Sequence, residues 1–478
     1  MTAIDLALVL PVLAAICLGF IRSPILGGWI NAFACFVELL VAILLVMEPP
    51  APTLLFFVDD FNVYLVLLTV FVAFTTALFS AGYVGHEVQA ERISPSLFRL
   101  YHAGYQLLLA AMVLALVANN IGLMWVAVEA ATLITVVMVS LYRTREAIEA
   151  SWKYFVLGSV GIALALFGTI LVYLAAQPAM GPGMAAMAWT LLHQEAAAFA
   201  APALNLAFVF LLIGYGTKVG LVPLHNWLPD AHAEGPTPIS AVLSGLLLNV
   251  ALYALLRFKM LLAANGAALA PGPLMIGLGL ASVWFAGLML YRRRDIKRFF
   301  AYSSIEHMGL AVFAFGLGGA ASFAGLLHMA MHSLTKSAIF FAVGRIAQVK
   351  GSQSLADIRG VTVSHPLLGW LFVASVLAIA GAPPFGVFVS EFLLITATVQ
   401  QAPWLAAPLV IGLVIGFGAL LRRVHSVGFG EPGPSVTLKV PLSTTVPLVL
   451  HLALVLIAGL ALPAPFVAWM RSVAGMLG

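Results

Sequence analysis

Two ionisable side chains lie inside apolar stretches of the sequence, where a charge must have a partner or a task. Glu129 has no basic neighbour within a helical turn, and Lys218 ends another apolar stretch. A charge at the bilayer centre costs about 2.5 to 3.5 kcal/mol even on a lenient scale. If Glu129 and Lys218 approach each other, each favours the charged form of the other, and separating them favours release of the lysine proton. This chemistry predicts proton transfer, and a static packing ion pair is the alternative.

Three more titratable residues are spaced along one helical face. His328, His332 and Lys336 recur at i, i+4 and i+8. In an α-helix this spacing drifts by only about 40° per step, so the three side chains form one row. We call them the central row, and Ser333 and Thr335 add hydroxyls beside it. The pattern predicts a proton relay, although a lone histidine in a membrane helix is more often a satisfied core residue.

Single residues extend this row in both directions. His307 follows an Arg/Lys-rich loop and is either a bridge from the cytoplasmic side to the central row or an interfacial helix-start residue. Glu391 follows a double proline in an apolar segment and is the best candidate for an exit group. Asn249 can position water but cannot titrate.

A polar cluster follows Lys218 along the chain. His225, Asp230, His232 and Glu234 lie in the loop that continues the lysine's segment, and they could feed protons to Lys218. Capping of helix ends is the equal alternative. A metal site is a weaker interpretation, because metal sites also need fixed geometry and a dry surrounding shell.

Membrane-spanning helices must position all these residues. Of the 478 residues 63% are hydrophobic and 8% are charged, with a mean hydropathy of +1.10, which excludes a water-soluble fold of this length. A span needs roughly 20 apolar residues. The sequence therefore predicts an all-α membrane protein with about fourteen spans, at residues 3–21, 28–47, 61–84, 102–118, 121–142, 152–176, 201–222, 237–262, 272–291, 300–317, 320–346, 366–400, 403–421 and 444–470.

The distribution of basic residues predicts the orientation. We expect the first span to be retained rather than cleaved as a signal peptide, because Asp5 and no basic residue precedes its apolar stretch. With the N-terminus outside, Arg257, Lys259 and Arg471 lie towards the outer side. Seventeen of the 22 Lys and Arg residues then lie in or beside inner loops: Arg22, Arg92, Arg99, Arg143, Arg145, Lys153, Arg292, Arg293, Arg294, Lys297, Arg298, Arg345, Lys350, Arg359, Arg422, Arg423 and Lys439.

This bias predicts a multi-pass protein of the bacterial inner membrane with both termini outside the cytoplasm. It also accounts for the net charge of +4 without nucleic acid as a partner. Cys17 and Cys35 are too few for a disulfide framework or a metal site. Because nucleotide, zinc and flavin motifs and a soluble domain are absent, we expect no cofactor, no metal and no enzyme acting alone.

Two spans are interrupted at comparable places. Residues 218–223, continuing to Pro229, and residues 381–386, followed by Glu391, each place a charge within about two helical turns of proline. Such paired broken segments are typical of inverted-repeat transporters with an ion site near the midplane. The alternative is that proline kinks these helices for packing alone.

From about Val113 to Phe429 the chain resembles the antiporter-like proton-translocating subunits shared by respiratory complex I, Mrp-type cation/proton antiporters and membrane-bound energy-converting hydrogenases. The motifs that carry the resemblance are Trp125 to Glu129, Lys218 to Pro238, Asp295 to Arg298 leading into Ala301-Tyr-Ser-Ser, His328 to Lys336, and Gly381 to Glu391.

The resemblance implies a fourteen-helix fold with two inverted five-helix repeats and broken helices 7 and 12. The corresponding units are N-terminal helices 1–3 at residues 1–100, a first repeat at 101–262, a second repeat at 263–422 and helix 14 at 423–478.

The resemblance also implies roles for individual residues. It makes Glu129 and Lys218 a coupling pair, Lys336 part of a central relay and Glu391 the terminal exit group. Many complex I members have Lys at the position of Asn249, so this chain lacks a full lysine chain. Several relatives have Lys at the position of Glu391, and the glutamate resembles the middle antiporter-like subunit of complex I and several hydrogenase subunits. The context of Asn249 and the His-Ser-Leu-Thr-Lys-Ser run that ends at Ser337 are most similar to the formate-hydrogenlyase and hydrogenase-type branch.

The predicted function is proton translocation by a non-catalytic subunit of a multisubunit redox complex. We expect other membrane subunits, a peripheral hydrogenase or dehydrogenase arm and the lipid bilayer as partners. A complex I subunit, an Mrp-type Na⁺/H⁺ antiporter subunit and a membrane scaffold without ion transport are the alternatives.

Overall fold

The computed structural model describes residues 2–435 and 441–478, and nearly all of them are helical. Lys439, counted above with the inner loops, lies outside the described residues. The α-helices are α1 (Ala3–Phe20), α2 (Pro24–Met47), α3 (Asp60–Gln89), α4 (Pro95–Val117), α5 (Ile121–Val139), α6 (Arg145–Met180), α7 (Trp189–Glu195), α8 (Ala201–Val219), α9 (Leu228–Glu234), α10 (Thr237–Val242), α11 (Leu248–Ala263), α12 (Gly272–Leu290), α13 (Ile296–Leu317), α14 (Ala320–Lys350), α15 (Val361–Ser364), α16 (Pro366–Ile379), α17 (Gly386–Gln401), α18 (Pro403–Gly428), α19 (Leu442–Leu460) and α20 (Ala464–Leu477).

The prediction of an all-α membrane protein is confirmed. Thirteen helices among the described residues are long and apolar enough to cross a membrane. The predicted span 366–400 is two shorter helices, α16 and α17, separated at residues 380–385. Taken together as one crossing, these two helices bring the thirteen to the fourteen that the sequence predicts.

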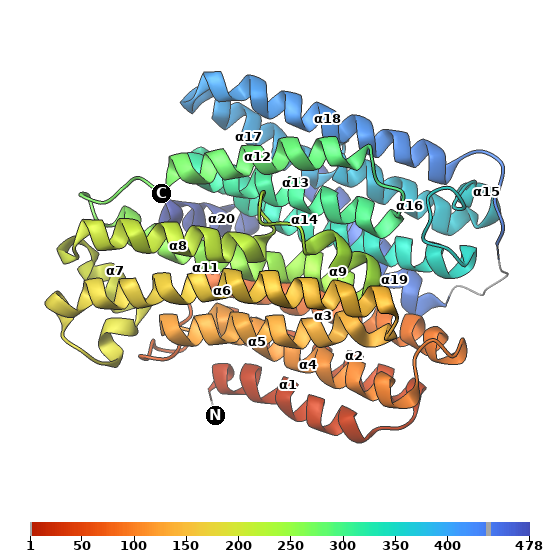
Figure 1. Ribbon diagram of the computed structural model, residues 1–478, viewed down its shortest axis with the longest axis horizontal. Coiled ribbons are helices and arrows are strands. Elements are labelled where there is room, and N and C mark those ends of the chain that lie inside the picture. Colours follow the sequence, from red (N-terminus) through yellow and green to blue (C-terminus); the bar gives the residue numbers. More distant parts are fainter. Residues whose placement is uncertain (1, 436–440) are drawn as a thin grey trace.

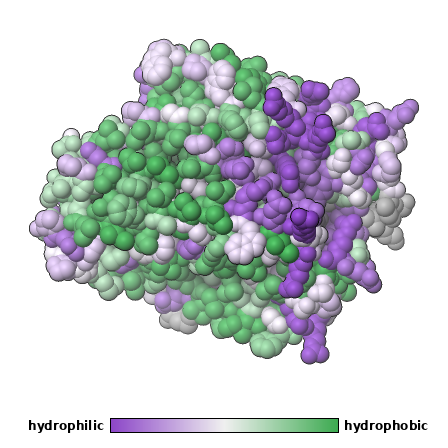
Figure 2. Space-filling view, viewed as in Figure 1, coloured by the Kyte–Doolittle hydropathy of each residue, from purple (hydrophilic) through white to green (hydrophobic). Residues whose placement is uncertain are grey.

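The helices run side by side along the long axis of the molecule (Figure 1). Both chain ends lie on the left in this view, and hydrophilic side chains gather in a band on the right, where α15 lies (Figure 2). The connection that carries Arg293 meets the loop before α15, since Ile296 N–H donates to the Gln353 carbonyl and Leu355 N–H to the Arg294 carbonyl. Arg92 and Tyr142 line one cavity together with residues 351–353 of that loop. We call this side the arginine-rich end.

Burial differs strongly between the helices. The most apolar windows of α14 and of the continuous segment Thr237–Ala263 are 100% buried inside the protein, whereas that of α1 is only 28% buried. α13 is buried nearly as deeply as α14. The innermost helices therefore carry the central row, Asn249 and His307, while α1, α2 and α18 provide apolar outer surface.

An irregular segment interrupts the chain immediately after Lys218. α8 ends where Gly220 adopts the left-handed conformation (φ +83°), which glycine accepts without strain, and its N–H returns to the carbonyls of Gly216 and Thr217. The indole of Trp227 donates to the Thr217 carbonyl at 2.8 Å and stacks on Tyr154 at 4.2 Å between centroids. These contacts fix the C-terminal end of α8, and with it the position of Lys218, against the packed rings of Trp227 and Tyr154.

Arg257 forms a buried ion pair that connects α3 and α11. The sequence places it towards the outer side, and its side chain is 1% exposed. Its guanidinium donates to Asp59 at 2.6 Å and lies 4.4 Å from the Trp189 ring, with Phe57, Phe61 and Tyr253 also within cation–π range.

We predict that Arg257→Leu lowers the free energy of unfolding by roughly 2–3 kcal/mol, somewhat less than for a fully buried pair because Asp59 retains 20% exposure. The loss arises because the Asp59 charge is left without its partner, so adding Asp59→Asn should recover part of it. Denaturant unfolding in detergent micelles measures both variants. Equal stability of the single and double variants would contradict this interpretation.

Candidate functional site

Lys218 is held by a threonine of a neighbouring helix. Its side chain is 2% exposed, and Nζ donates to the Thr132 hydroxyl of α5 at 2.6 Å. Nζ also lies 5.4 Å from the Tyr154 ring centroid. A Cβ added at Gly158 would lie 2.8 Å from Nζ, so the absence of a side chain there gives the ammonium its space.

The charges of Glu129 and Lys218 interact with each other, and no ion pair within 4.0 Å joins their side chains among the described residues. Glu129 precedes Thr132 by one helical turn, so the two side chains share a face of α5. Glu129 Oε2 is buried without a hydrogen-bond partner in the described part of the chain. The coupling of these two charges stays a prediction, and the structure adds Thr132 as the hydroxyl that Lys218 contacts. Spacing within α5 did not reveal this, because the position of Lys218 depends on how α8 packs.

Lys336 lies at the centre of the molecule with its side chain fully buried. Nζ donates to the Phe300 carbonyl at 3.1 Å and lies 5.7 Å from the same residue's ring centroid. The ammonium can accommodate further acceptors, since it carries three N–H donors and this structure gives it one such partner.

A π-helical turn at Leu243–Leu247 brings Asn249 next to the central row. Asn249 Nδ2 donates to Ser333 at 2.7 Å, and the Ser333 hydroxyl lies 2.6 Å from the Gly245 carbonyl. Asn249 Oδ1 is buried without a partner among the described residues. An oriented amide with a free oxygen is suited to hold a water molecule, as the sequence predicts for a residue that cannot titrate.

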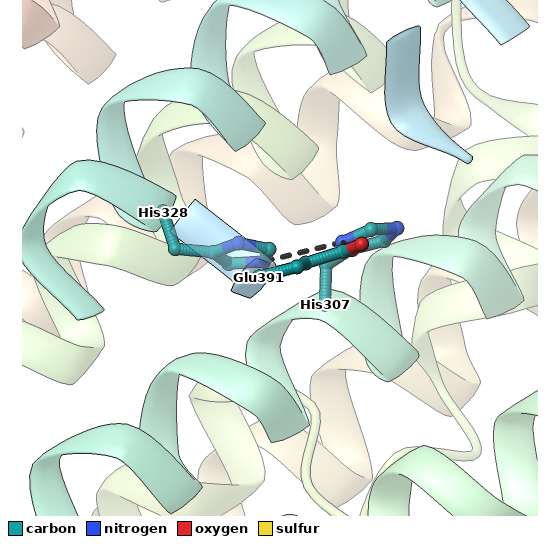
Figure 3. A group of neighbouring side chains, drawn as sticks. All are labelled: His307, His328 and Glu391. Carbon is teal, nitrogen blue, oxygen red and sulfur yellow. Dashed lines mark hydrogen bonds and ion pairs between the residues drawn. The ribbon is translucent and has the colours of Figure 1, made fainter. Parts of the chain in front are cut away.

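Three side chains from three helices form a cluster held by one hydrogen bond and one longer polar contact (Figure 3). His307 Nδ1 of α13 lies 3.1 Å from His328 Nε2 of α14 and 3.9 Å from Glu391 Oε1 of α17. His328 Nδ1 lies 3.0 Å from the Ser390 hydroxyl. His332 stacks on His307 at 5.8 Å between centroids. The cluster joins the central row to Glu391 through His307.

The alternative that His307 is an interfacial helix-start residue is wrong. α13 begins at Ile296 rather than near residue 300, so His307 lies three turns inside it and is 2% exposed. Residue spacing did not predict its contact with His328, because the two helices meet only through tertiary packing.

Glu306 is a buried carboxylate that the sequence interpretation missed. Its side chain is 2% exposed, and Oε2 has no hydrogen-bond partner among the described residues. Glu306, His307 and Glu391 line one cavity of about 220 Å³. Glycines face the two carboxylates, since a Cβ at Gly416 would collide with Glu306 and one at Gly381 with Glu391. Its position next to His307 in the sequence was the available signal.

The polar cluster after α8 does not form one site. Asp230 lies 2.6 Å from Lys153 and 3.4 Å from Arg298, and Glu234 lies 3.1 Å from Arg298. These carboxylates cross-link helices near the arginine-rich end. The contacts supply partners for both acids, so no metal ligand set assembles from them.

The two histidines of that segment contact aromatic rings rather than the basic residues that pair with the two acids. His225 packs against Phe285 at 4.9 Å between centroids, and burial lowers its pKa. His232 is fully buried and stacks on Phe340, with both ring nitrogens unpartnered among the described residues. Capping, the other interpretation of the segment, does not describe His225 either, since the N-cap residue of α9 is Trp227 and no side chain of the described residues donates or accepts a capping hydrogen bond there.

One group in the described part of the chain has the spacing of metal ligands. One ligand atom each from His307, His328 and Glu391 lies within 4.8 Å of the others. Two imidazoles and a carboxylate are a donor set that zinc accepts. The ring nitrogens and the carboxylate oxygen that could bind a metal already contact one another and the Ser390 hydroxyl. The arrangement is therefore also suited to proton exchange.

Residues 118–416 match the protein family described as "NADH:quinone oxidoreductase/Mrp antiporter, TM". The chain is 57% identical over 463 residues to the "Hydrogenase-4 component F homolog" of Methylacidiphilum infernorum, covering 96% of this chain and 97% of that relative.

Solved structures share the fold. A chain of the membrane-bound sulfane sulfur reductase, an archaeal respiratory membrane complex, superposes with a TM-score of 0.86 at 23% identity, covering 99% of this chain and 97% of that one. A chain of the Mrp complex from Dietzia superposes with a TM-score of 0.83 at 20% identity, covering 99% and 96%.

We predict that Thr132→Val slows proton movement through the reconstituted protein roughly tenfold or more. A hydrogen bond to a charged group contributes about 1.5–3 kcal/mol, and the valine removes it while keeping the side-chain volume. Thr135→Val is the matched control, because that hydroxyl donates within its own helix to Ala131. Proton uptake by proteoliposomes distinguishes the two, and equal effects would refute a specific role for Thr132.

Proposed function

The chain belongs to the family of membrane subunits that NADH:quinone oxidoreductases and Mrp antiporters share, and on that premise we propose that it translocates protons as a non-catalytic subunit of a membrane-bound redox complex. Redox chemistry in partner subunits would change the charge balance at Glu129 and Lys218. The protons would then move along the central row to Glu391.

One observation carries this proposal: titratable side chains follow one another through the most buried helices. Lys336 and His332 belong to α14, and His328, His307 and Glu391 are joined by contacts of 3.1 and 3.9 Å. Several polar atoms between them have no protein partner in the described part of the chain, including both His332 nitrogens and Ser337 Oγ. Buried polar atoms of this kind are usually satisfied by water, which conducts protons between fixed groups.

The energy required is modest. Moving one elementary charge against 100 mV takes about 2.3 kcal/mol. The free-energy penalty for a charge at the bilayer centre is about 2.5 to 3.5 kcal/mol. A change in the hydration of one ionised group therefore involves a free energy as large as that needed to move one proton against 100 mV.

The 57% identical relative supports a hydrogenase-type complex, and we propose other membrane subunits and a peripheral hydrogenase arm as partners. A complex I subunit, an Mrp-type Na⁺/H⁺ antiporter subunit and a scaffold remain the rival functions. We place the chain in a bacterial inner membrane with both termini outside the cytoplasm, on the basis of the loop charges.

We also propose that residues 101–262 and 263–422 are inverted repeats. The irregular segments after α8 and after α16 support this division, because each lies beside an ionisable side chain, the buried Lys218 in one case and the 13% exposed Glu391 in the other.

Replacing Lys218 by alanine should abolish proton pumping by the complex and leave its assembly intact, because the ammonium contacts one hydroxyl and no structural ion pair among the described residues. Pumping is measured as quenching of a pH-sensitive dye in proteoliposomes, and assembly by copurification of partner subunits. Wild-type pumping by this variant would overturn the relay.

The same preparation separates the rivals. Glu129→Gln should impair energy conservation, whereas a scaffold would conserve energy normally. A pH gradient that requires sodium would instead favour Na⁺/H⁺ exchange. Subunits that copurify identify the complex: nickel–iron subunits for a hydrogenase, NADH-oxidising flavin subunits for complex I.

Glu306→Gln should reduce pumping severalfold, because the amide keeps the shape of the side chain but cannot carry a proton at neutral pH. Glu38→Gln is the matched control: it makes the same substitution at another buried carboxylate, on the outer helix α2. Equal pumping by the Glu306 variant and wild type would remove Glu306 from the path.

A further inference from the structure

A second cavity opens at the arginine-rich end, away from the relay. Its volume is about 410 Å³, and a buried carboxylate forms part of its wall. The polar residues that line it include Tyr83, Glu87, Arg92, Tyr142, Glu234 and Gln348. We call it the polar vestibule.

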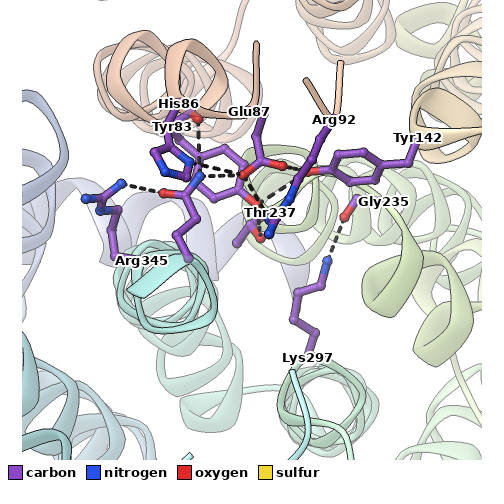
Figure 4. A network of polar contacts seen from close by, with 10 residues as sticks. Tyr83, His86, Glu87, Arg92, Tyr142, Gly235, Thr237, Lys297 and Arg345 are labelled. Carbon is purple, nitrogen blue, oxygen red and sulfur yellow. Dashed lines mark hydrogen bonds and ion pairs between the residues drawn. The ribbon is translucent and has the colours of Figure 1, made fainter. Parts of the chain in front are cut away.

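Glu87 is buried in this wall but surrounded by hydrogen-bonding groups (Figure 4). Its side chain is 1% exposed. Gln348 donates to Oε1 at 2.6 Å, and the Tyr142 hydroxyl donates to Oε2 at 3.2 Å. Arg92 lies 3.6 Å from Oε1 and is itself half exposed at 49%, so the charge partner of Glu87 extends into solvent.

Three hydroxyls lead inward from Glu87. The Tyr142 hydroxyl lies 3.5 Å from that of Tyr83, which lies 3.1 Å from the hydroxyl of Thr237 at the start of α10. Each hydroxyl can accept one proton while it donates its own, so a row of them transfers protons without ionising.

Beyond Thr237 the path reaches groups that lack protein partners. The ring nitrogens of His232 are both unpartnered among the described residues, and its ring interacts electrostatically with Lys297 and Lys336. Lys297 donates to the Gly235 carbonyl at 2.7 Å. Because unpaired buried nitrogens are costly, water is expected between Thr237, His232 and the central row.

We propose that Glu87 collects protons from the polar vestibule and that Tyr142, Tyr83 and Thr237 pass them towards His232 and Lys336. We call this path the inlet. It rests on the proposed function and adds the route by which protons enter the protein. The competing interpretation is a structural clamp, in which the same hydrogen bonds only hold α3, α5 and α14 together.

Reconstituted complexes carrying Glu87→Gln or Tyr83→Phe test the inlet. Both variants keep the side-chain shape, and we expect pumping to fall roughly tenfold or more at pH 8. The deficit should shrink at pH 6, because more bulk protons replace the missing collector. Charged or titratable groups facing Glu87 are His86 and Arg92 beside it, Tyr142 after α5, Lys297 of α13 and Arg345 of α14.

Tyr105→Phe is the matched control. Its hydroxyl is also buried, and it donates to the Ala73 carbonyl within the same helical layer at 2.7 Å, away from the vestibule. We expect its pumping to stay within about twofold of wild type, since it loses one neutral hydrogen bond of similar strength. A clamp predicts losses that do not depend on pH, and that result would overturn the inlet.

A chemical measurement keeps the inlet testable if these variants fail to assemble. In a background with Cys17 and Cys35 replaced by serine, Ala347→Cys in the wall of the polar vestibule should react with a membrane-impermeant methanethiosulfonate added at the arginine-rich side. No reaction from either side would refute a hydrated vestibule. If the wild-type complex does not pump protons, the proposed function is refuted. If it pumps and the Glu87 and Tyr83 variants pump at the same rate, only the inlet is refuted.

Discussion

An ionised side chain loses its hydration when it enters a bilayer, and the architecture of this protein follows from that loss. Lys218, Lys336 and Glu391 lie in or beside the most buried helices, where each finds a hydroxyl, a carbonyl or an imidazole. None of these partners neutralises the charge completely. The groups are therefore stable enough to persist and responsive enough to a neighbouring charge to exchange protons. The apolar outer helices keep this interior away from lipid.

Glycines create the space in which these groups lie. Gly158 faces the Lys218 ammonium, Gly416 faces Glu306 and Gly381 faces Glu391. A methyl group at any of them would lie 2.8 Å or less from the ammonium or carboxylate atom that it faces. Small residues usually allow membrane helices to approach closely. At these three positions they instead make room for polar atoms and for the water that those atoms require.

Local patterns in the sequence predicted what depends on one helix at a time. Composition predicted the spans, and the four-residue period predicted the row formed by His328, His332 and Lys336. Contacts between helices could not be predicted in the same way. Thr132 rather than Glu129 receives the Lys218 hydrogen bond, and Glu306 faces a cavity whose walls come from distant segments. A residue's neighbours across a helix interface depend on the packing of the whole bundle, which no spacing within one segment encodes.

The π turn at Leu243–Leu247 makes the register of one helix functionally important. A π turn contains an additional residue relative to an α-helix, and each residue of an α-helix rotates the chain by about 100°. The Gly245 carbonyl inside this turn accepts from Ser333 at 2.6 Å and from Asn249 at 3.3 Å, and deleting a single residue there would displace the carbonyl that both side chains contact. The amide beside the central row thus depends on an insertion rather than on a side chain, so helix length is itself a determinant of polar connectivity in this protein.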